Sequence, residues 1–107
     1  MPSAAYMLFR KAIRTEQQVV CVYDGRPREL CPHIIGRNRN GEQVVLAWQF
    51  AGESSGKLPQ WRCLRLALVS DVSLRKGPWL EGGSHLSEQT CVSEIDLDIN
   101  VHVRKRR

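Results

Sequence analysis

After residue 17, the apolar residues of this 107-residue chain fall in short runs divided by turn-forming residues, and this restricts the chain to a β-rich fold. Valine and isoleucine, which favour strands, recur in the runs at 18–23, 28–36 and 43–50. An Asn40-Gly41 pair before the third run predicts a hairpin. Pro32 restricts the second run to an edge, an end or a bulge of the sheet.

Two later segments alternate with a period of two, the spacing at which strand side chains share a face. Residues 61–72 (WRCLRLALVSDV) predict one buried strand, with Leu64, Leu66 and Leu68 on the same face. Residues 94–103 alternate apolar and polar side chains. This second pattern predicts an accessory, half-buried strand that shows its polar face to water or to a partner.

The N-terminal segment carries a helical pattern. Ser3 is a candidate N-cap for a helix over residues 4–16. Apolar residues recur there at helical spacing, namely Ala5, Leu8, Phe9, Ala12 and Ile13. We therefore expect one domain over residues 1–107, mainly β (α+β), in which a small β-barrel or strongly curled sheet packs against one N-terminal α-helix.

The net charge of +5 is unevenly distributed along the chain. The first 80 residues contain 12 Lys or Arg and 6 Asp or Glu, whereas residues 81–103 contain 5 acidic residues and no Lys or Arg. Residues 104–107 (RKRR) form a basic tail. Such a tail is either a solvated terminus or a segment that holds an acidic partner or nucleic acid through salt-sensitive contacts.

Hydropathy and cysteine spacing predict a cytoplasmic protein. No apolar run is long enough to span a membrane, and Arg10 and Lys11 interrupt the N-terminal segment too early for a secretory signal. We therefore expect no membrane contact. The four cysteines form no Cys-x-x-Cys pair, and in a cytoplasmic chain buried free thiols are the expected state.

The residues that could perform catalysis or hold a metal form no compact motif. Cys91 with His85, or Cys31 with His33, has the residue types of a nucleophile and its base. Neither cysteine follows a glycine-rich elbow or opens an obvious helix, features that would activate a thiol. The same four residues would form a Cys₂His₂ zinc set only if the fold joined two pairs that are distant in sequence. We expect no enzyme, no cofactor and no metal, with a zinc- or thiol-dependent enzyme as an alternative.

Three arginines, Arg28, Arg62 and Arg65, lie in or beside predicted strands. A guanidinium keeps its charge in a protein, and its burial without a partner costs several kcal/mol. These arginines therefore either bind an external anion or pair with carboxylates of the chain. For Arg65, the internal partners would be Asp71, Glu29 and Asp24.

Aromatic and imidazole side chains occur near these arginines in the predicted pattern, namely Tyr23, His33 and Trp48. Arginine donates paired hydrogen bonds to phosphate or carboxylate, and aromatic rings offer stacking faces. The combination suits a nucleotide or single-stranded nucleic acid.

The order of residues in 8–50 (LFRKAIRTEQQVVCVYDGRPRELCPHIIGRNRNGEQVVLAWQF) and 61–72 resembles the WYL domain of bacterial ligand-sensing regulators. The similar pattern is an amphipathic helix that ends in Ala-Ile, a strand with Tyr before a turn, an Arg and a Pro, a hairpin, and an Arg-rich strand. The residues that name the family are Val44, Val45 and Leu46 here, and Ala67-Leu68 replaces its usual Asp-Arg.

The resemblance implies an SH3-like or Sm-like β-barrel with a basic pocket for negatively charged ligands, among them nucleotides and nucleic acid. Tyr23, Arg28 and Pro32 match the first part of the family pattern, and Arg62 and Arg65 match the first two arginines of its last strand. The chain lacks the family's N-terminal winged-helix DNA-binding domain, so it looks like a stand-alone module.

We therefore expect a non-enzymatic ligand-sensing or regulatory module, related to transcription regulation, that binds an anionic small ligand or single-stranded nucleic acid. The expected ligand-binding residues are Tyr23, Arg28, His33, Trp48, Arg62 and Arg65. The alternative from another class is an adaptor for a regulator protein, or a homodimer, that pairs through the edge strand at 94–103.

Overall fold

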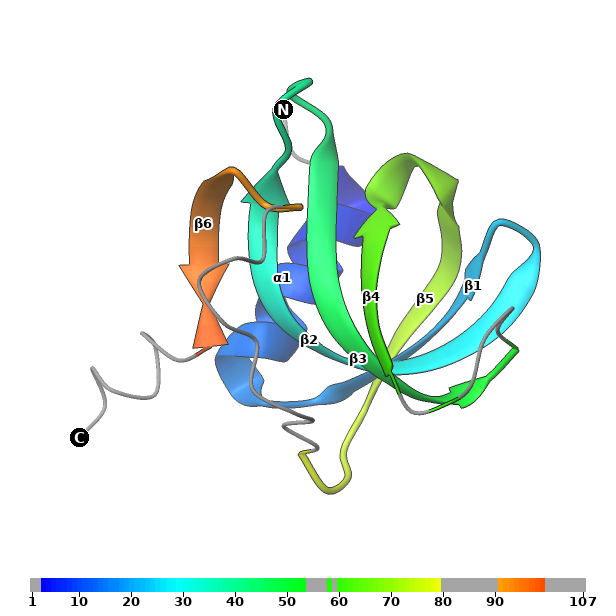
Figure 1. Ribbon diagram of the computed structural model, residues 1–107. Helices are drawn as coiled ribbons and strands as arrows, with labels where there is room; N and C mark the ends of the chain where they lie inside the picture. Colours follow the sequence, from blue (N-terminus) through cyan, green and yellow to red (C-terminus); the bar gives the residue numbers. More distant parts are fainter. Residues whose placement is uncertain (1–2, 54–57, 59, 80–90, 100–107) are drawn as a thin grey trace.

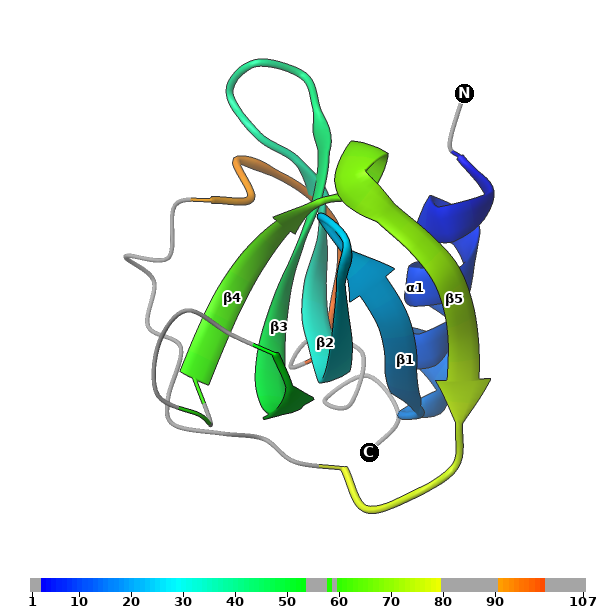
Figure 2. The same cartoon turned by 90° about the vertical axis from the view of Figure 1, so that its right-hand side faces the viewer.

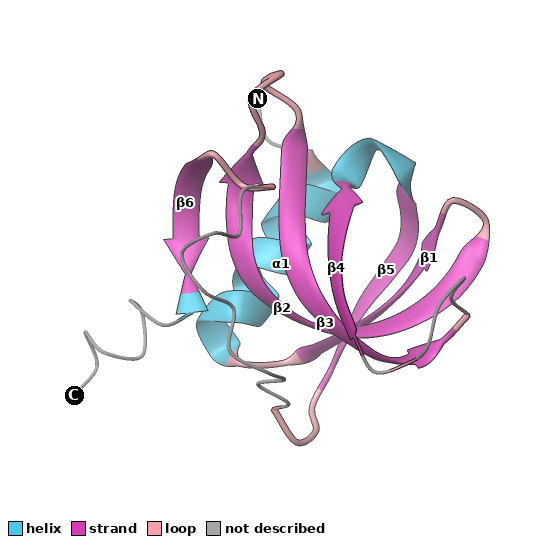
Figure 3. Ribbon diagram, in the orientation of Figure 1, coloured by secondary structure: helices cyan, strands magenta, loops and turns pink. Residues whose placement is uncertain are grey.

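The computed structural model describes residues 3–53, 58, 60–79 and 91–99. These residues form a mainly β structure in which an N-terminal helix packs against one antiparallel sheet (Figures 1 and 3). Within them, no helix has the length and the apolar character that crossing a membrane requires. The predicted basic tail at 104–107 lies outside the described residues.

The sheet follows the order β4-β3-β2-β1-β5, and β6 pairs with β2 beside that path. In the described part β4 and β5 are not paired with each other, so the sheet is not closed. Figure 2 shows that the sheet is strongly curled. The elements are α1 (Ala4–Thr15), β1 (Gln18–Tyr23), β2 (Arg26–Arg37), β3 (Gln43–Gly52), β4 (Gln60–Arg65), the 3₁₀ turn η1 (Leu66–Leu68), β5 (Val69–Arg75) and β6 (Glu94–Asp98).

The predicted strand over residues 61–72 is wrong in its length. The chain leaves the sheet at η1 after β4, and β5 then pairs antiparallel with β1. Leu64 and Leu66 are buried as expected, whereas Leu68 is partly exposed. The period of two continues through the turn, and this is why the sequence pattern does not reveal the break.

Helix α1 begins and ends with capping interactions. The Ser3 hydroxyl accepts a hydrogen bond from the Tyr6 N–H at 3.1 Å, which confirms the predicted N-cap. Glu16 follows the helix in the left-handed conformation, with φ of 53°. The buried face differs from the predicted one, because Tyr6 is buried and Leu8 is partly exposed.

Two hairpins set the register of β1, β2 and β3. Asp24 and Gly25 both have positive φ, 50° and 81°, as a tight two-residue turn requires. The predicted β2–β3 hairpin is present, but its loop is longer than two residues, because the Asn38 N–H donates to the Glu42 carbonyl at 3.0 Å. A register shift between Pro32 and Ile34 marks the bulge expected at Pro32.

Two apolar clusters lie on opposite faces of the central strands. The main core joins the buried face of α1 to the inner face of the sheet, where it includes Val45 of β3 and Leu64 of β4. The smaller outer cluster contains Ile34, Val44, Leu46 and Val92, with Trp61 and Cys91 packed against it. The inner face is thus covered by a helix, whereas the outer face is contacted by residues just before β6.

The predicted accessory strand is present over 94–98, and residues 100–103 lie outside the described residues. It pairs antiparallel with the second half of β2, where Gly36 faces Ile95. A Cβ atom on Gly36 would overlap the backbone of Glu94, so this close approach requires glycine. On the other side of β6, Asp96 accepts hydrogen bonds from Tyr6 and Arg10 of α1.

Candidate functional site

The inner face of the sheet brings together three of the six predicted ligand-binding residues, Tyr23, Arg28 and Arg62. Tyr23 is in β1, Arg28 is in β2 and Arg62 is in β4. By the period of two, Arg28 lies on the same face as the core residue Leu30, and Arg62 on the same face as Leu64. The three residues therefore lie where the apolar core meets the more polar end of the curled sheet.

Arg28 is buried, with 7% of its surface exposed. Its Nη1 donates a hydrogen bond of 2.8 Å to Gln49 Oε1. Its Nε is also buried and donates to no acceptor among the described residues. A buried N–H group without an acceptor is unfavourable, so the described residues leave one donor of Arg28 unsatisfied.

The surroundings of Arg28 are electropositive. Burial first, and then the charges of Arg62 and Arg26, lower the pKa of Arg28 from its ordinary value. The other described groups that act on this pKa are Tyr23 and Cys21, so within the described part of the chain no carboxylate is among them. Burial raises the pKa of Cys21 to about 11, and its thiol is therefore neutral at pH 7.

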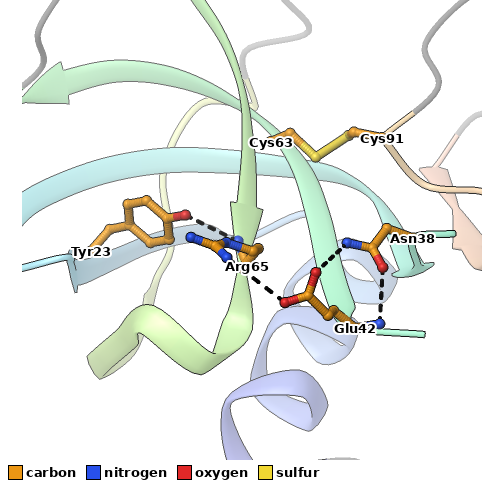
Figure 4. Close-up of a disulfide and its surroundings, with 6 residues drawn as sticks. All are labelled: Tyr23, Asn38, Glu42, Cys63, Arg65 and Cys91. Carbon is orange, nitrogen blue, oxygen red and sulfur yellow. Dashed lines mark hydrogen bonds and ion pairs between the residues drawn. A yellow bond between two sulfur atoms is a disulfide. The ribbon is translucent and has the colours of Figure 1, made fainter. Parts of the chain in front are cut away.

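Gln49 and Tyr23 hold the Arg28 guanidinium in position. The Gln49 amide donates to the carbonyls of Ala51 and Glu53 at 3.2 and 2.9 Å, which directs its oxygen to Arg28. The Arg28 guanidinium carbon lies 5.4 Å from the centre of the Tyr23 ring. The Tyr23 hydroxyl in turn accepts a hydrogen bond of 3.2 Å from the Arg65 backbone N–H (Figure 4).

The side chain of Arg65 belongs to the other face of the sheet. Its Nη1 lies 3.8 Å from Glu42 Oε2, in an exposed ion pair (Figure 4). The internal carboxylates expected for it are therefore not its partners in the described part, and Glu29 instead pairs with Arg75 at 2.7 Å. Exposed ion pairs contribute little stability, so this contact does not hold Arg65 in place.

His33 and Trp48 lie in an aromatic cluster with Trp61 and Trp79. Ring centres are separated by 4.9 Å between His33 and Trp61, 5.1 Å between His33 and Trp79, and 5.1 Å between Trp48 and Trp61. Trp61 also packs on the outer apolar cluster. The structure thus separates these two predicted ligand residues from Arg28.

The expectation of four free thiols is wrong for Cys63 and Cys91, which form a disulfide (Figure 4). The outer face of β4 presents Cys63 to the residues that lead into β6, and these carry Cys91. Cys21 and Cys31 are buried and are not part of a disulfide. Bonded to Cys63, Cys91 offers no thiolate either as a nucleophile or as a zinc ligand.

His85, the remaining member of the candidate zinc set, lies outside the described residues. Within the part of the chain that the structure describes, no group of three or more His, Cys, Asp or Glu side chains is arranged to hold a metal ion.

An open hollow of about 380 Å³ lies beside the disulfide on the outer face. It is lined by Asn38, Arg39, Asn40, Val44, Cys63, Arg65 and Cys91. The described residues therefore offer two separate groups of arginines, one buried on the inner face and one exposed on the outer face.

Sequence reasoning missed Gln49, Trp61 and Trp79 as parts of these sites. Gln49 could have been found, because it follows Val45 and Ala47 at a period of two and so is a polar residue on a core-facing row. Trp79 follows β5 after a Gly-Pro pair, and the sequence contains no signal that places it against His33.

No family model, no curated protein and no solved structure matches this chain. The site is therefore interpreted from its own geometry.

Proposed function

We propose that this chain is a non-catalytic module that binds an anionic ligand on the inner face of its sheet. The observation that carries the proposal is Arg28, a buried cation. Among the described residues it has one hydrogen bond, to a neutral amide, its buried Nε has no acceptor, and no carboxylate acts on it. Buried charges are normally paired, so an anion from solution is the missing partner.

The proposed ligand is a nucleotide or single-stranded nucleic acid. Arg28 and Arg62 supply the positive charge that phosphate needs, and Tyr23 supplies a hydroxyl and a ring. The ring already contacts the Arg28 guanidinium, so we expect Tyr23 to orient this arginine more than to stack on a base.

The fold we propose is a small SH3-like or Sm-like barrel, of the kind that the WYL resemblance implies. Support comes from the meander β1-β2-β3-β4 and from η1, which returns the chain so that β5 pairs with β1 at the opposite end of the sheet path. A cytoplasmic, ligand-sensing role in regulation is part of the same proposal.

The test is a thermal-shift screen of nucleotides, DNA and RNA oligonucleotides and dicarboxylates at two salt concentrations. A ligand that binds only the folded state raises the melting temperature. We expect a shift that persists in added salt and is lost in Arg62→Gln. Arg65→Gln is the matched control, because it removes the same charge from the outer face of the same strand, and it should keep the shift.

Two outcomes would contradict the proposal. One is the absence of a shift with every anion. The other is a shift that is equal in wild type and Arg62→Gln but lost in Arg65→Gln, which would move binding to the outer hollow.

A second candidate function is an adaptor that pairs through β6. Ile95 is 57% exposed on this strand, and in the described part β6 pairs with β2 alone. Glu94, Asp96 and Asp98 make the strand acidic, so pairing with a second copy would place like charges close together. A basic partner strand is therefore favoured over a homodimer, and light scattering that shows a dimer at micromolar concentration would reverse that preference.

A further inference from the structure

The disulfide on the outer face is open to small molecules. Cys63 is exposed, and both of its cysteines line the hollow of about 380 Å³. Thiol–disulfide exchange requires that an attacking sulfur reach one of the bonded sulfur atoms, and a buried disulfide forbids this. The exposed Cys63 meets that requirement better than Cys91, which is partly buried.

The hollow is also positively charged. Arg39 and Arg65 both line it. Arg65 lies two residues after Cys63 in β4, so the two side chains share the outer face. Among the described residues, the acidic partner of Arg65 is Glu42, whose carboxylate lies 3.8 Å from Arg65 Nη1 and is itself exposed. Solvent screens this exposed pair, and Arg39 adds a second positive charge.

We propose that this hollow is a thiol-exchange site at which a small, carboxylate-bearing thiol modifies Cys63. The two arginines raise the local concentration of an anionic thiol and favour its thiolate, the attacking species. The same two charges repel a cationic thiol and lower its local concentration at the hollow.

The exchange is balanced in electrons and atoms. The incoming thiolate forms a bond to Cys63 Sγ, the Cys63–Cys91 bond breaks, and its electron pair leaves on Cys91 Sγ, which takes a proton from water. A second thiolate of the same kind then attacks the small-molecule sulfur of the mixed disulfide. The bond from that sulfur to Cys63 Sγ breaks, its electron pair leaves on Cys63 Sγ, which takes a proton from water, and the oxidised thiol dimer is released.

The modified chain keeps contacts that hold β6 in place. The Ser93 N–H donates to the Arg37 carbonyl at 2.8 Å, β6 pairs with β2 along residues 34–37, and neither contact involves the disulfide. Modification at Cys63 is therefore compatible with a folded chain, and the mixed disulfide should be detectable on native protein.

The experiment measures how fast glutathione, an anionic thiol, and cysteamine, a cationic thiol, open the disulfide of the oxidised full chain. Each rate is divided by the rate of the same thiol with oxidised 2-mercaptoethanol, an uncharged reference disulfide. We expect the ratio of the normalised glutathione rate to the normalised cysteamine rate to be about three to ten at low salt and to approach one in added salt. Mass spectrometry should locate glutathione on Cys63.

Arg39→Gln and Arg65→Gln should each lower the ratio, and the double variant should bring it close to one. Glu42→Gln should raise it. Lys11→Gln, which removes one positive charge from the exposed side of α1, is the matched control and should leave the ratio unchanged. A wild-type ratio of one, an equal fall in the Lys11 control, or glutathione found on Cys91 would overturn the proposal.

Discussion

The inner and outer faces of β2, β3 and β4 differ in what stabilises them. The inner face lies in the main core with α1, and it ends in the electropositive surroundings of Arg28. The outer face has a four-residue apolar cluster, the ring contacts of Trp61 with His33 and Trp48, and a disulfide. A small apolar cluster buries too little surface to hold a segment by itself. The comparison indicates that burial stabilises the inner face, whereas the outer face depends on its crosslink.

Removal of the disulfide tests that dependence and should lower the free energy of unfolding most. In the double variant Cys63→Ser/Cys91→Ser, we expect the free energy of unfolding to fall by about 3 kcal/mol, because the disulfide closes a loop of 28 residues in the unfolded chain. Urea denaturation measures the change. Reduction of the wild type should give a similar loss and should not affect the double variant. A double variant as stable as the oxidised wild type would show that the crosslink is not needed.

The next prediction compares two adjacent valines of β3 on opposite faces. Val44 and Val45 are 1% and 0% exposed, in the outer and main clusters respectively. Val45→Ala should cost about 2 kcal/mol and Val44→Ala about 1 kcal/mol, because the smaller cluster can relax around the lost methyl groups. Both values come from urea denaturation.

A double-mutant cycle sharpens this comparison. In the Cys63→Ser/Cys91→Ser background the cost of Val44→Ala should shrink, because the outer cluster is no longer held together, and the cost of Val45→Ala should stay the same. Equal costs for both valines in both backgrounds would mean that the two faces are stabilised alike.

Local signals in the sequence predicted much of the fold. Ser3 as N-cap, the bulge at Pro32 and the hairpin before β3 each follow from the chemistry of one or two residues. The break at Leu66–Leu68 was not predictable in the same way, because its residues continue the strand period. Tertiary pairing of β5 with β1 decides the break, and a local pattern contains no information about that pairing.

The candidate site was predictable to a similar extent. Tyr23 and Arg28 lie on the two strands of one hairpin, so the turn and the period of two place their side chains on the same face. The Cys63–Cys91 bond and the pairing of Arg65 with Glu42 depend on which strands are neighbours. Arg65 faces Val44 across the β3–β4 pair. Val44 lies two residues after Glu42, so this register brings Arg65 near Glu42. Which residues face each other across two strands is decided by the pairing of the whole sheet, and a local sequence pattern does not contain it.

A smaller effect concerns the contact between β6 and α1. The Tyr6 hydroxyl donates to Asp96 at 2.7 Å. Tyr6→Phe should lower the free energy of unfolding by about 1 kcal/mol at neutral pH, because it removes a hydrogen bond to a charged group. Arg10→Gln, which removes the exposed ion pair to the same carboxylate, should cost less. If the Tyr6 variant is unchanged, this contact does not stabilise β6.

The difference in unfolding free energy between the wild type and Tyr6→Phe depends on pH with a definite sign. The hydrogen bond from Tyr6 lowers the pKa of Asp96, so its contribution is lost as the pH falls below 3.8, the ordinary value. Burial and then Asp96 raise the pKa of Tyr6 from 10.0 to about 12, so its contribution is complete below pH 10.0 and is lost between these values. Unfolding curves at pH 3, 7 and 12 should show the stability advantage of the wild type over Tyr6→Phe at its largest at pH 7 and reduced at both extremes.

The smallest effect on stability is expected at Arg28, and it separates a binding residue from a structural one. Arg28→Met leaves the Gln49 oxygen without its donor, which costs about 1 kcal/mol. It also removes a buried charge that has no counter-charge among the described residues, which offsets a similar amount. We expect the free energy of unfolding without ligand to change by less than about 1 kcal/mol.

Added sulfate should then stabilise the wild type more than Arg28→Met at equal ionic strength, because sulfate supplies the missing anion. Arg65→Met on the outer face should respond to sulfate as the wild type does. A loss of several kcal/mol in Arg28→Met without ligand would mean that the guanidinium is a structural part of the core, and an unaltered sulfate response would mean that the anion binds elsewhere. Stability and anion response, measured on the same variant, thus decide whether Arg28 is retained for binding or for folding.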